Sequence, residues 1–438
     1  MKIEITNPGK WYQSLTIKLI LLAFMGLVFL IPLEMIKSII MERQKNAGQV
    51  RQEISRQWAE KQCISGPVLN IPIRTVPTEK DEKPVSMVWH IMPETLNMTG
   101  VINPEIRYRG IYQSVVYGSD MQISGDFILP ENPALEGYDI FLNNAYITLG
   151  ITDNRGLKGG VVLKTGTGEV QAEPGVKDQD LFISGVTFNY PLAGKAGKID
   201  FRINLNLSGS EGILITPVGK TTSTHLSSSW PSPSFNGSFL PSQRSVSEKG
   251  FSADWEVTHL NRNFPQSWKG NAFQTAESSF GFDLYMPVDH YQKSWRSARY
   301  GILFIALTFL VLIFLEITRK ENIHIFHYFL VSLGLILFFS LLNSLSEQTG
   351  FNLAYLISSA ATVILLTLFT GALFSNKKTA FVVFGMLAIL YLFIFVLLTL
   401  NDYAYLAGNI GLFILLAVIM RLAARMKIFK EEIQSEGD

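Results

Sequence analysis

The chain has 438 residues, a formal net charge of +1 at pH 7, 48% hydrophobic residues and 17% charged residues. Its charged fraction is below the roughly one quarter that is usual in soluble domains, and its near-neutral charge gives no sign of a nucleic-acid partner. The single cysteine, Cys63, excludes an intrachain disulfide bond.

Apolar runs of about 20 residues are long enough to cross a hydrocarbon core roughly 30 Å thick. The first run, at 15–36, follows a lysine-containing segment at 1–14. No small-residue cleavage site follows this run, so we predict an uncleaved membrane anchor rather than a signal peptide. Five more runs occupy 299–421 and complete a predicted six-helix transmembrane bundle. These five runs are 299–318, 324–345, 352–374, 379–400 and 403–421.

Basic residues are unevenly distributed beside these apolar runs. The connections at 319–323 and 375–378 and the tail at 422–438 carry lysine or arginine, whereas the alternate loops hold Glu347 and Asp402 and no basic residue. Cytoplasmic loops are enriched in lysine and arginine. We therefore predict that both termini lie in the cytoplasm of a bacterium and that the long segment after the first run lies in the periplasm.

A membrane-proximal helix is predicted at 37–65, the start of the external segment 37–298. Val50, Ile54 and Trp58 recur four residues apart and form a narrow apolar stripe. We expect the first span to continue as a helix and to pack on the domain that follows, with a partner-binding coiled coil as the alternative.

Residues 66–298 have the pattern of a β domain. Short runs rich in β-forming residues are separated by turn residues, and in the run at 198–209 apolar and polar residues alternate strictly. Alternation of this kind is typical of strands with one buried face, so we predict an all-β, sandwich-like domain. The candidate strands are 106–118, 121–129, 145–153, 181–190, 198–209 and 251–260.

The uncharged stretch SSWPSPSFNGSFLP, at 228–241, is predicted to break the strand pattern because proline cannot donate to a sheet ladder. Trp230, Phe235 and Phe239 can still cover apolar surface. A loop folded back on the sandwich is one interpretation, and a recognition surface on that loop is the other.

Motifs for catalysis or metal binding are weak. GKT at 219–221 lacks the upstream glycine of a phosphate-binding loop, and neither G-x-S-x-G nor H-E-x-x-H occurs. His324 and His327, near Glu316, are expected to form an interfacial polar cluster, with a proton-handling or metal site as the alternative. We predict no catalytic, cofactor or metal site. The external histidines, each expected to be a surface or half-buried residue, are His90, His225, His259 and His290.

Several long segments match the motifs of one family. They are 227–255 (SSSWPSPSFNGSFLPSQRSVSEKGFSADW), 287–309, 345–351 (LSEQTGF) and the D-x-R-G turn of Asp153, Arg155 and Gly156. On these segments the chain resembles, over nearly its full length, the CreD family of bacterial inner-membrane, cell-envelope-integrity proteins. The resemblance implies a role in envelope stress and implies no enzymatic activity.

We therefore expect a non-enzymatic envelope protein that contacts the lipid bilayer and whose periplasmic β domain binds an envelope protein, peptidoglycan or a lipid. The alternatives are a small-solute or lipid transporter, or an envelope enzyme that uses acids such as Asp153, Glu347 and Asp289. The absence of ionisable residues near the centre of any span and of evident repeats counts against a transporter. The candidate binding surface consists of Asp153, Arg155, Gly156, Trp230, Pro231, Pro233, Phe235, Gly237, Phe239 and Glu347.

Overall fold

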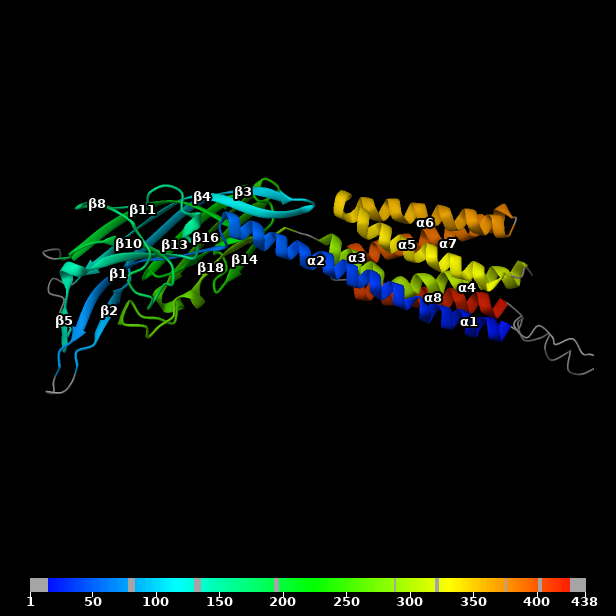
Figure 1. The fold of residues 1–438 in the computed structure, drawn as a ribbon, viewed down its shortest axis with the longest axis horizontal. Helices are drawn as coiled ribbons and strands as arrows, with labels where there is room; N and C mark the ends of the chain where they lie inside the picture. Colours follow the sequence, from blue (N-terminus) through cyan, green and yellow to red (C-terminus); the bar gives the residue numbers. More distant parts are fainter. Residues whose placement is uncertain are drawn as a thin grey trace, which may run out of the picture. The chain divides into compact units, whose positions relative to one another are not determined.

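The chain divides into two compact units in the computed structural model (Figure 1). One unit is Ala47–Pro287, and the other combines Met1–Asn46 with Val288–Asp438. The structure describes residues 15–77, 83–129, 135–192, 197–286, 289–319, 323–374, 376–400 and 404–425.

The first span and the membrane-proximal helix form an almost unbroken run. Helix α1 (Leu15–Val28) and helix α2 (Leu30–Trp58) are interrupted only at Phe29. Backbone hydrogen bonds of 3.0 and 3.4 Å on either side of Phe29 continue the helical ladder. Pro32 accounts for the interruption because it lacks an N–H and its ring crowds the carbonyl of Val28. The helix ends short of the predicted residue 65, since a strand begins at residue 62.

Five helices in the described part of the chain are long and apolar enough to cross a membrane: the α1–α2 run, α4, α5, α6 and α7. The sixth predicted span, 403–421, falls on α8, which contains several side chains outside the described set, so a count of six stays a prediction. The helices after the β unit are α3 (Asp289–Arg299), α4 (Gly301–Arg319), α5 (Ile325–Thr349), α6 (Phe351–Leu373), α7 (Lys377–Thr399) and α8 (Ala404–Arg425).

Aromatic rings pack the helical unit together. The ring of Tyr391 on α7 lies 4.7 Å from that of Phe304 on α4 and 4.8 Å from that of Phe338 on α5. Gly350 joins α5 to α6 with a φ of +78°, a conformation that glycine adopts without strain, and its N–H bonds the Ser346 carbonyl. The LSEQTGF motif is therefore the end of α5 and its turn into α6.

The predicted polar cluster around Glu316 forms with different partners. Glu316 pairs with Lys18 of α1 and accepts a 2.8 Å hydrogen bond from the Tyr328 hydroxyl. His324 instead caps α5, since its Nδ1 accepts a 3.2 Å bond from the Phe326 N–H. Glu316 thus ties α4 to α1 and α5, and the histidines lie beside that contact rather than within it.

The β unit contains two sheets. The ten-stranded sheet has the order β14-β18-β12-β1-β6-β10-β9, with β2 and β5 also pairing β1 and β17 pairing β2. Its strands are β1 (Gln62–Thr75), β2 (Ser86–Ile91), β5 (Tyr138–Ile140), β6 (Tyr146–Ile151), β9 (Glu173–Pro174), β10 (Gly185–Asn189), β12 (Gly212–Thr216), β14 (Pro233–Gly237), β17 (Ser267–Lys269) and β18 (Phe280–Leu284).

The eight-stranded sheet has the order β15-β16-β13-β3-β4-β11-β7-β8. Its strands are β3 (Thr95–Arg109), β4 (Tyr112–Leu129), β7 (Val162–Thr165), β8 (Gly168–Gln171), β11 (Gly197–Ser210), β13 (Thr221–Ser228), β15 (Gln243–Ser247) and β16 (Gly250–Thr258). The pairs β1–β12 and β3–β13 are parallel, and the other pairs are antiparallel.

One apolar core lies between the two sheets, and it confirms the predicted all-β sandwich. The alternation in β11 buries Phe201, Ile203 and Leu205 while the residues between them are exposed. Rings also meet across the sheets. Trp255 of β16 stacks on Phe280 of β18 with ring centroids 5.4 Å apart. Removing apolar surface from water stabilises a fold by about 25 cal/mol per Å². The core between the sheets is therefore a main source of the stability of the sandwich.

Two strand predictions are wrong. The segment 106–118 contains a hairpin turn, because the chain reverses at Gly110, where φ is +64°, between β3 and β4. The stretch 228–241 does not wholly break the strand pattern, since β14 forms within it. β14 is the outermost strand of its sheet and begins with Pro233, and an edge strand tolerates a residue that cannot donate.

Candidate functional site

The D-x-R-G turn directly follows β6 and forms the 3-10 turn η3 (Asn154–Gly156). The Asp153 side chain caps this turn by accepting a 3.1 Å bond from the Arg155 N–H, a common role for aspartate. Gly156 lies directly against β11, where a Cβ would be 2.2 Å from the Ser208 carbonyl oxygen. Only glycine can bring the turn this close to the second sheet.

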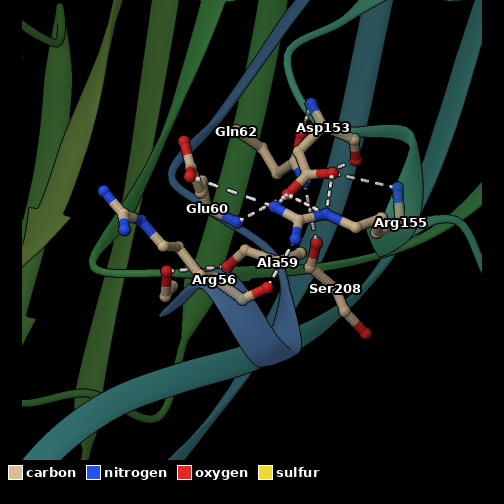
Figure 2. A network of polar contacts seen from close by, with 8 residues as sticks. Arg56, Ala59, Glu60, Gln62, Asp153, Arg155 and Ser208 are labelled. Carbon is tan, nitrogen blue, oxygen red and sulfur yellow. Dashed lines mark hydrogen bonds and ion pairs between the residues drawn. The ribbon is translucent and has the colours of Figure 1, made fainter. Parts of the chain in front are cut away.

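The Asp153 carboxylate is surrounded by donors from its own chain (Figure 2). The Arg155 guanidinium donates from Nε at 2.9 Å and from Nη2 at 2.7 Å, a bidentate arrangement. The Glu60 N–H donates at 3.0 Å. The hydrogen bonds from Arg155 hold the pKa of Asp153 below its ordinary value, so the carboxylate is charged at neutral pH.

The same turn binds the end of helix α2. Nη1 of Arg155 donates a 2.5 Å hydrogen bond to the Arg56 carbonyl oxygen, and the Ser210 hydroxyl donates a 2.7 Å bond to the Ala59 carbonyl oxygen. The last carbonyls of a helix have no partner within the helix. Here side chains of the β unit supply the donors, so the helix end is fastened to the sheets.

Gln62 connects the two sheets beneath this turn. Its Nε2 donates to the carbonyl oxygens of Asp153, at 3.0 Å, and of Ser208, at 3.1 Å, while its Oε1 accepts from the Asp153 N–H at 3.2 Å. The side chain is completely buried. Sequence reasoning missed Gln62, and the signal available was a strongly polar residue at the start of a mostly apolar strand.

Trp58, the last residue of α2, lies on the second sheet. Its Nε1 donates to the Tyr117 carbonyl oxygen at 3.3 Å, and the cations of Arg107 and Lys158 lie 5.0 and 5.5 Å from its ring centre. The predicted packing of this helix on the β domain is therefore observed. We call the residues that hold the helix end the helix clamp: Trp58, Glu60, Gln62, Arg107, Asp153, Arg155, Gly156, Ser208 and Ser210.

The aromatic side chains of the stretch 228–241 pack against the sandwich core. Trp230 donates from Nε1 to the Tyr285 carbonyl oxygen at 3.1 Å. Phe235 meets Trp255 edge-on at 5.9 Å, and Phe239 contacts Phe280 at 6.2 Å. The stretch therefore folds back on the sandwich as one interpretation expected.

Other residues of the stretch have different settings. Pro231 is exposed, whereas Pro233 is half-buried at the start of β14. Gly237 has a φ of +93°, and a Cβ there would be 2.3 Å from the Ser279 carbonyl oxygen. Pro231 and its neighbours Ser229 and Ser232 thus form an exposed part of the stretch.

Polar contacts link a residue between two members of the helix clamp to this stretch. Lys61, beside Glu60, forms an ion pair with Asp283 of β18, and Asn236 of β14 donates a 2.7 Å bond to the same carboxylate. The strands β1, β12, β18 and β14 are consecutive neighbours in one sheet. Two segments predicted separately from sequence are thus connected through Asp283.

Glu347 belongs to the helical unit, near the end of α5. Its Oε1 lies 3.5 Å from the Tyr291 hydroxyl of α3, and Ser346 lies 3.5 Å from Ser294. The side chain of Asp289, the other acid considered from sequence, lies outside the described residues. In the β unit, a separate group of metal-type ligands gathers in the described residues: His90, Asp178 and Asp180.

Comparison with known proteins agrees with the motifs. The family model described as "Inner membrane protein CreD" matches residues 14–428. Inner membrane protein CreD of Escherichia coli (strain K12) is 34% identical to this chain over 346 residues, which is 76% of this chain and 76% of that protein. The resemblance inferred from the sequence is therefore confirmed, and this chain belongs to the CreD family of inner membrane proteins.

Proposed function

We propose that this inner membrane protein maintains the cell envelope without catalysing a reaction, and that its β unit binds an envelope protein, peptidoglycan or lipid in the periplasm. Binding would act on the membrane through helix α2. Membership of the CreD family supports the envelope assignment, and the distribution of lysine and arginine supports the orientation.

The helix clamp is the observation that carries this proposal. Helix α2 continues the first apolar span, and Arg155 of the β unit donates to its last turn at the Arg56 carbonyl oxygen. Four residues beyond the helix, Gln62 makes buried hydrogen bonds to both sheets. The Asp153 carboxylate accepts bonds from Arg155 and from the Glu60 N–H, so its oxygens are occupied by the protein itself. Groups arranged in this way hold a joint in place and supply no free acid or base for a reaction.

The clamp is tested with Arg155→Ala in the full-length protein, expressed in cells that lack the wild-type copy. We expect greater sensitivity to envelope-disrupting agents at equal protein level, because the helix end loses the donor to Arg56. Lys198→Ala is the matched control, since Lys198 also pairs with an acid, Asp200, but on exposed surface away from the helix. Equal sensitivity of the two variants at equal protein level would contradict the proposal.

The orientation is tested by cysteine labelling. Leu240 is 69% exposed at the end of the aromatic stretch, so Leu240→Cys in a Cys63→Ser background offers one accessible thiol. We expect a membrane-impermeant maleimide to label this thiol in cells whose outer membrane alone has been opened. Labelling only after the inner membrane is ruptured would place the β unit in the cytoplasm and overturn the assignment.

A further inference from the structure

His90 of β2 has a side chain that is completely buried. Its Nδ1 lies 2.7 Å from Oδ1 of Asn70. The Asn70 amide is oriented by its own bonds, because Nδ2 donates to the Val68 carbonyl oxygen at 3.1 Å and to the Thr148 hydroxyl at 3.0 Å. Oδ1 can only accept, so the proton of the neutral ring is on Nδ1 and a lone pair remains on Nε2.

That lone pair has no hydrogen-bond donor among the described residues. Nε2 is buried and lacks a hydrogen-bond partner, and the nearest carboxylate oxygen, Oδ2 of Asp180, is 3.5 Å away. Leaving a buried polar atom without a partner is unfavourable.

Two carboxylates complete the group. Asp178 and Asp180 lie in the segment between β9 and β10, and the candidate ligand atoms of the three residues are all within 4.8 Å of one another. The Asp180 side chain is 30% exposed, so the group is open to solvent on one side. In the described part of the chain, neither carboxylate is in an ion pair with lysine or arginine, and Lys177 donates instead to Asn189.

The Asp178 carboxylate is held in position by hydrogen bonds. Asp178 accepts a hydrogen bond from the Tyr146 hydroxyl on β6 and a 3.2 Å bond from the Asp180 N–H. Metal ligands in proteins are commonly held in this way, with the second nitrogen of a histidine and the free side of a carboxylate hydrogen-bonded to neighbouring groups. Asn70 and Tyr146 fill these two positions here.

We propose that His90, Asp178 and Asp180, here called the His90 group, bind a divalent transition-metal ion such as Zn²⁺. One imidazole nitrogen and two carboxylate oxygens suit zinc, whereas calcium and magnesium prefer oxygen ligands alone. Zinc–ligand distances of about 2.0–2.1 Å place tetrahedral ligands about 3.3 Å apart, close to the observed 3.5 Å between Nε2 and Oδ2 of Asp180.

The charges also balance. A neutral imidazole and two carboxylates compensate the two positive charges of the ion, and three protein ligands leave a fourth position for water or for a group of an envelope ligand. This site lies apart from the helix clamp in the sheets and does not depend on the proposed function. Failure of either proposal would leave the other standing.

Zinc titration of the full-length, detergent-solubilised protein tests the site. The protein is stripped of metal with a chelator, its purification tag is removed, and Zn²⁺ binding is measured by calorimetry. We expect about one Zn²⁺ per chain at this site, and a loss of about tenfold or more in affinity in Asp180→Asn and Asp178→Asn. At the same zinc concentration, zinc should also raise the unfolding temperature of the wild type by more than that of these variants.

The exposed pair of His225 and Asp254, whose Nδ1 and Oδ1 are 2.7 Å apart, provides the matched control. Asp254→Asn should bind zinc with the affinity of the wild type. His327→Gln, which removes one of the two neighbouring histidines of the helical unit, should also leave the zinc affinity unchanged. Wild-type affinity in Asp180→Asn, or an equal loss in Asp254→Asn, would overturn the proposal.

X-ray absorption of the wild-type zinc complex identifies the zinc ligands without using any variant, so misfolding of a variant cannot affect the result. One imidazole with oxygen ligands is expected. A spectrum without imidazole, with several imidazoles or with sulfur would contradict the site, as would the absence of saturable binding.

Discussion

The helix clamp and the His90 group are both polar sites of the β unit with a buried member, Gln62 in one and His90 in the other, but they differ in how their atoms are satisfied. In the helix clamp every oxygen of the Asp153 carboxylate accepts a bond from the protein, and both ends of the Gln62 amide are used. In the His90 group, Nε2 is buried without a hydrogen-bond partner among the described residues. A saturated network suits a structural joint, whereas the unpartnered Nε2 of His90 beside two carboxylates suits the proposed metal site.

This comparison predicts opposite consequences of mutation. Changes in the helix clamp should lower the stability of the β unit whether or not metal is present. Changes in the His90 group should lower metal affinity and leave the metal-free protein nearly as stable as before.

Gly156→Ala should have the largest effect. A Cβ at this position would be 2.2 Å from the Ser208 carbonyl oxygen, so the turn and β11 must separate, at a cost of about 2–3 kcal/mol. Hydrogen exchange of β-unit amides in the full-length protein measures this cost. Gly160→Ala is the control because its nearest neighbour, Oε1 of Gln171, is 3.8 Å away. Equal exchange in the two variants would break the clamp interpretation.

Asp153→Asn should have the next largest effect, and the effect should depend on pH. The variant keeps the shape of the side chain but loses the charge that Arg155 contacts, which costs about 1–2 kcal/mol at neutral pH. Because the pKa of Asp153 is lowered in the folded protein, its contribution is present above about pH 3.9, the ordinary value, and is lost as the pH falls through the lowered value.

Unfolding of wild type and Asp153→Asn should therefore differ at pH 7 and converge in acid. Asp200→Asn, which alters an exposed pair with Lys198 on β11, should match the wild type at each pH. A difference between wild type and Asp153→Asn that grows on acidification would contradict the assigned direction.

Tyr146→Phe tests whether the hydroxyl that contacts Asp178 supports zinc binding by the His90 group. The variant keeps the ring but removes the hydroxyl that donates to Asp178, so zinc affinity should fall about tenfold while metal-free stability changes little. The visible spectrum of bound Co²⁺ should shift at the same time. Tyr117→Phe removes a buried hydroxyl bound to the Gly212 carbonyl oxygen and should lower stability without changing zinc affinity. Lower metal-free stability with unchanged zinc affinity in Tyr146→Phe would assign Tyr146 a purely structural role.

Trp230→Phe should have the smallest effect. It removes the bond from Nε1 to the Tyr285 carbonyl oxygen and keeps an aromatic ring on the core, so a loss of about 0.5–1 kcal/mol is expected in thermal unfolding. Leu240→Ala, at a side chain that is 69% exposed, should change stability less. A larger loss of stability in Leu240→Ala than in Trp230→Phe would show that the Leu240 side chain contributes to the packing of the stretch.

Local patterns in the sequence predicted much of the fold. The apolar runs located the membrane-length helices, and the alternation in β11 indicated a sandwich. The hairpin at Gly110 was missed because the residues around it have strong strand character and only the positive φ marks the turn. The parallel pairs β1–β12 and β3–β13 were not predicted, since pairing between distant segments leaves no local signal.

The sites were predicted less completely than the fold, for the same reason. The D-x-R-G motif located Asp153 and Arg155, but their partners Glu60 and Gln62 lie far away in the chain. The expected surface or half-buried position of His90 is wrong, since the residue is completely buried, and its neighbours Asp178 and Asp180 follow it only after several intervening strands. Such groups become visible only when the sheets bring their members together.

The position of Gln62 gives the β unit a mechanical property. This one amide touches the backbone on both sheets, in the turn after β6 and in β11, and it lies four residues beyond the end of α2. Separating the sheets would break these bonds next to the residues that hold the end of the helix, Arg155 and Ser210. We therefore expect strain on the helix end and loosening of the sandwich to be coupled at this corner of the β unit.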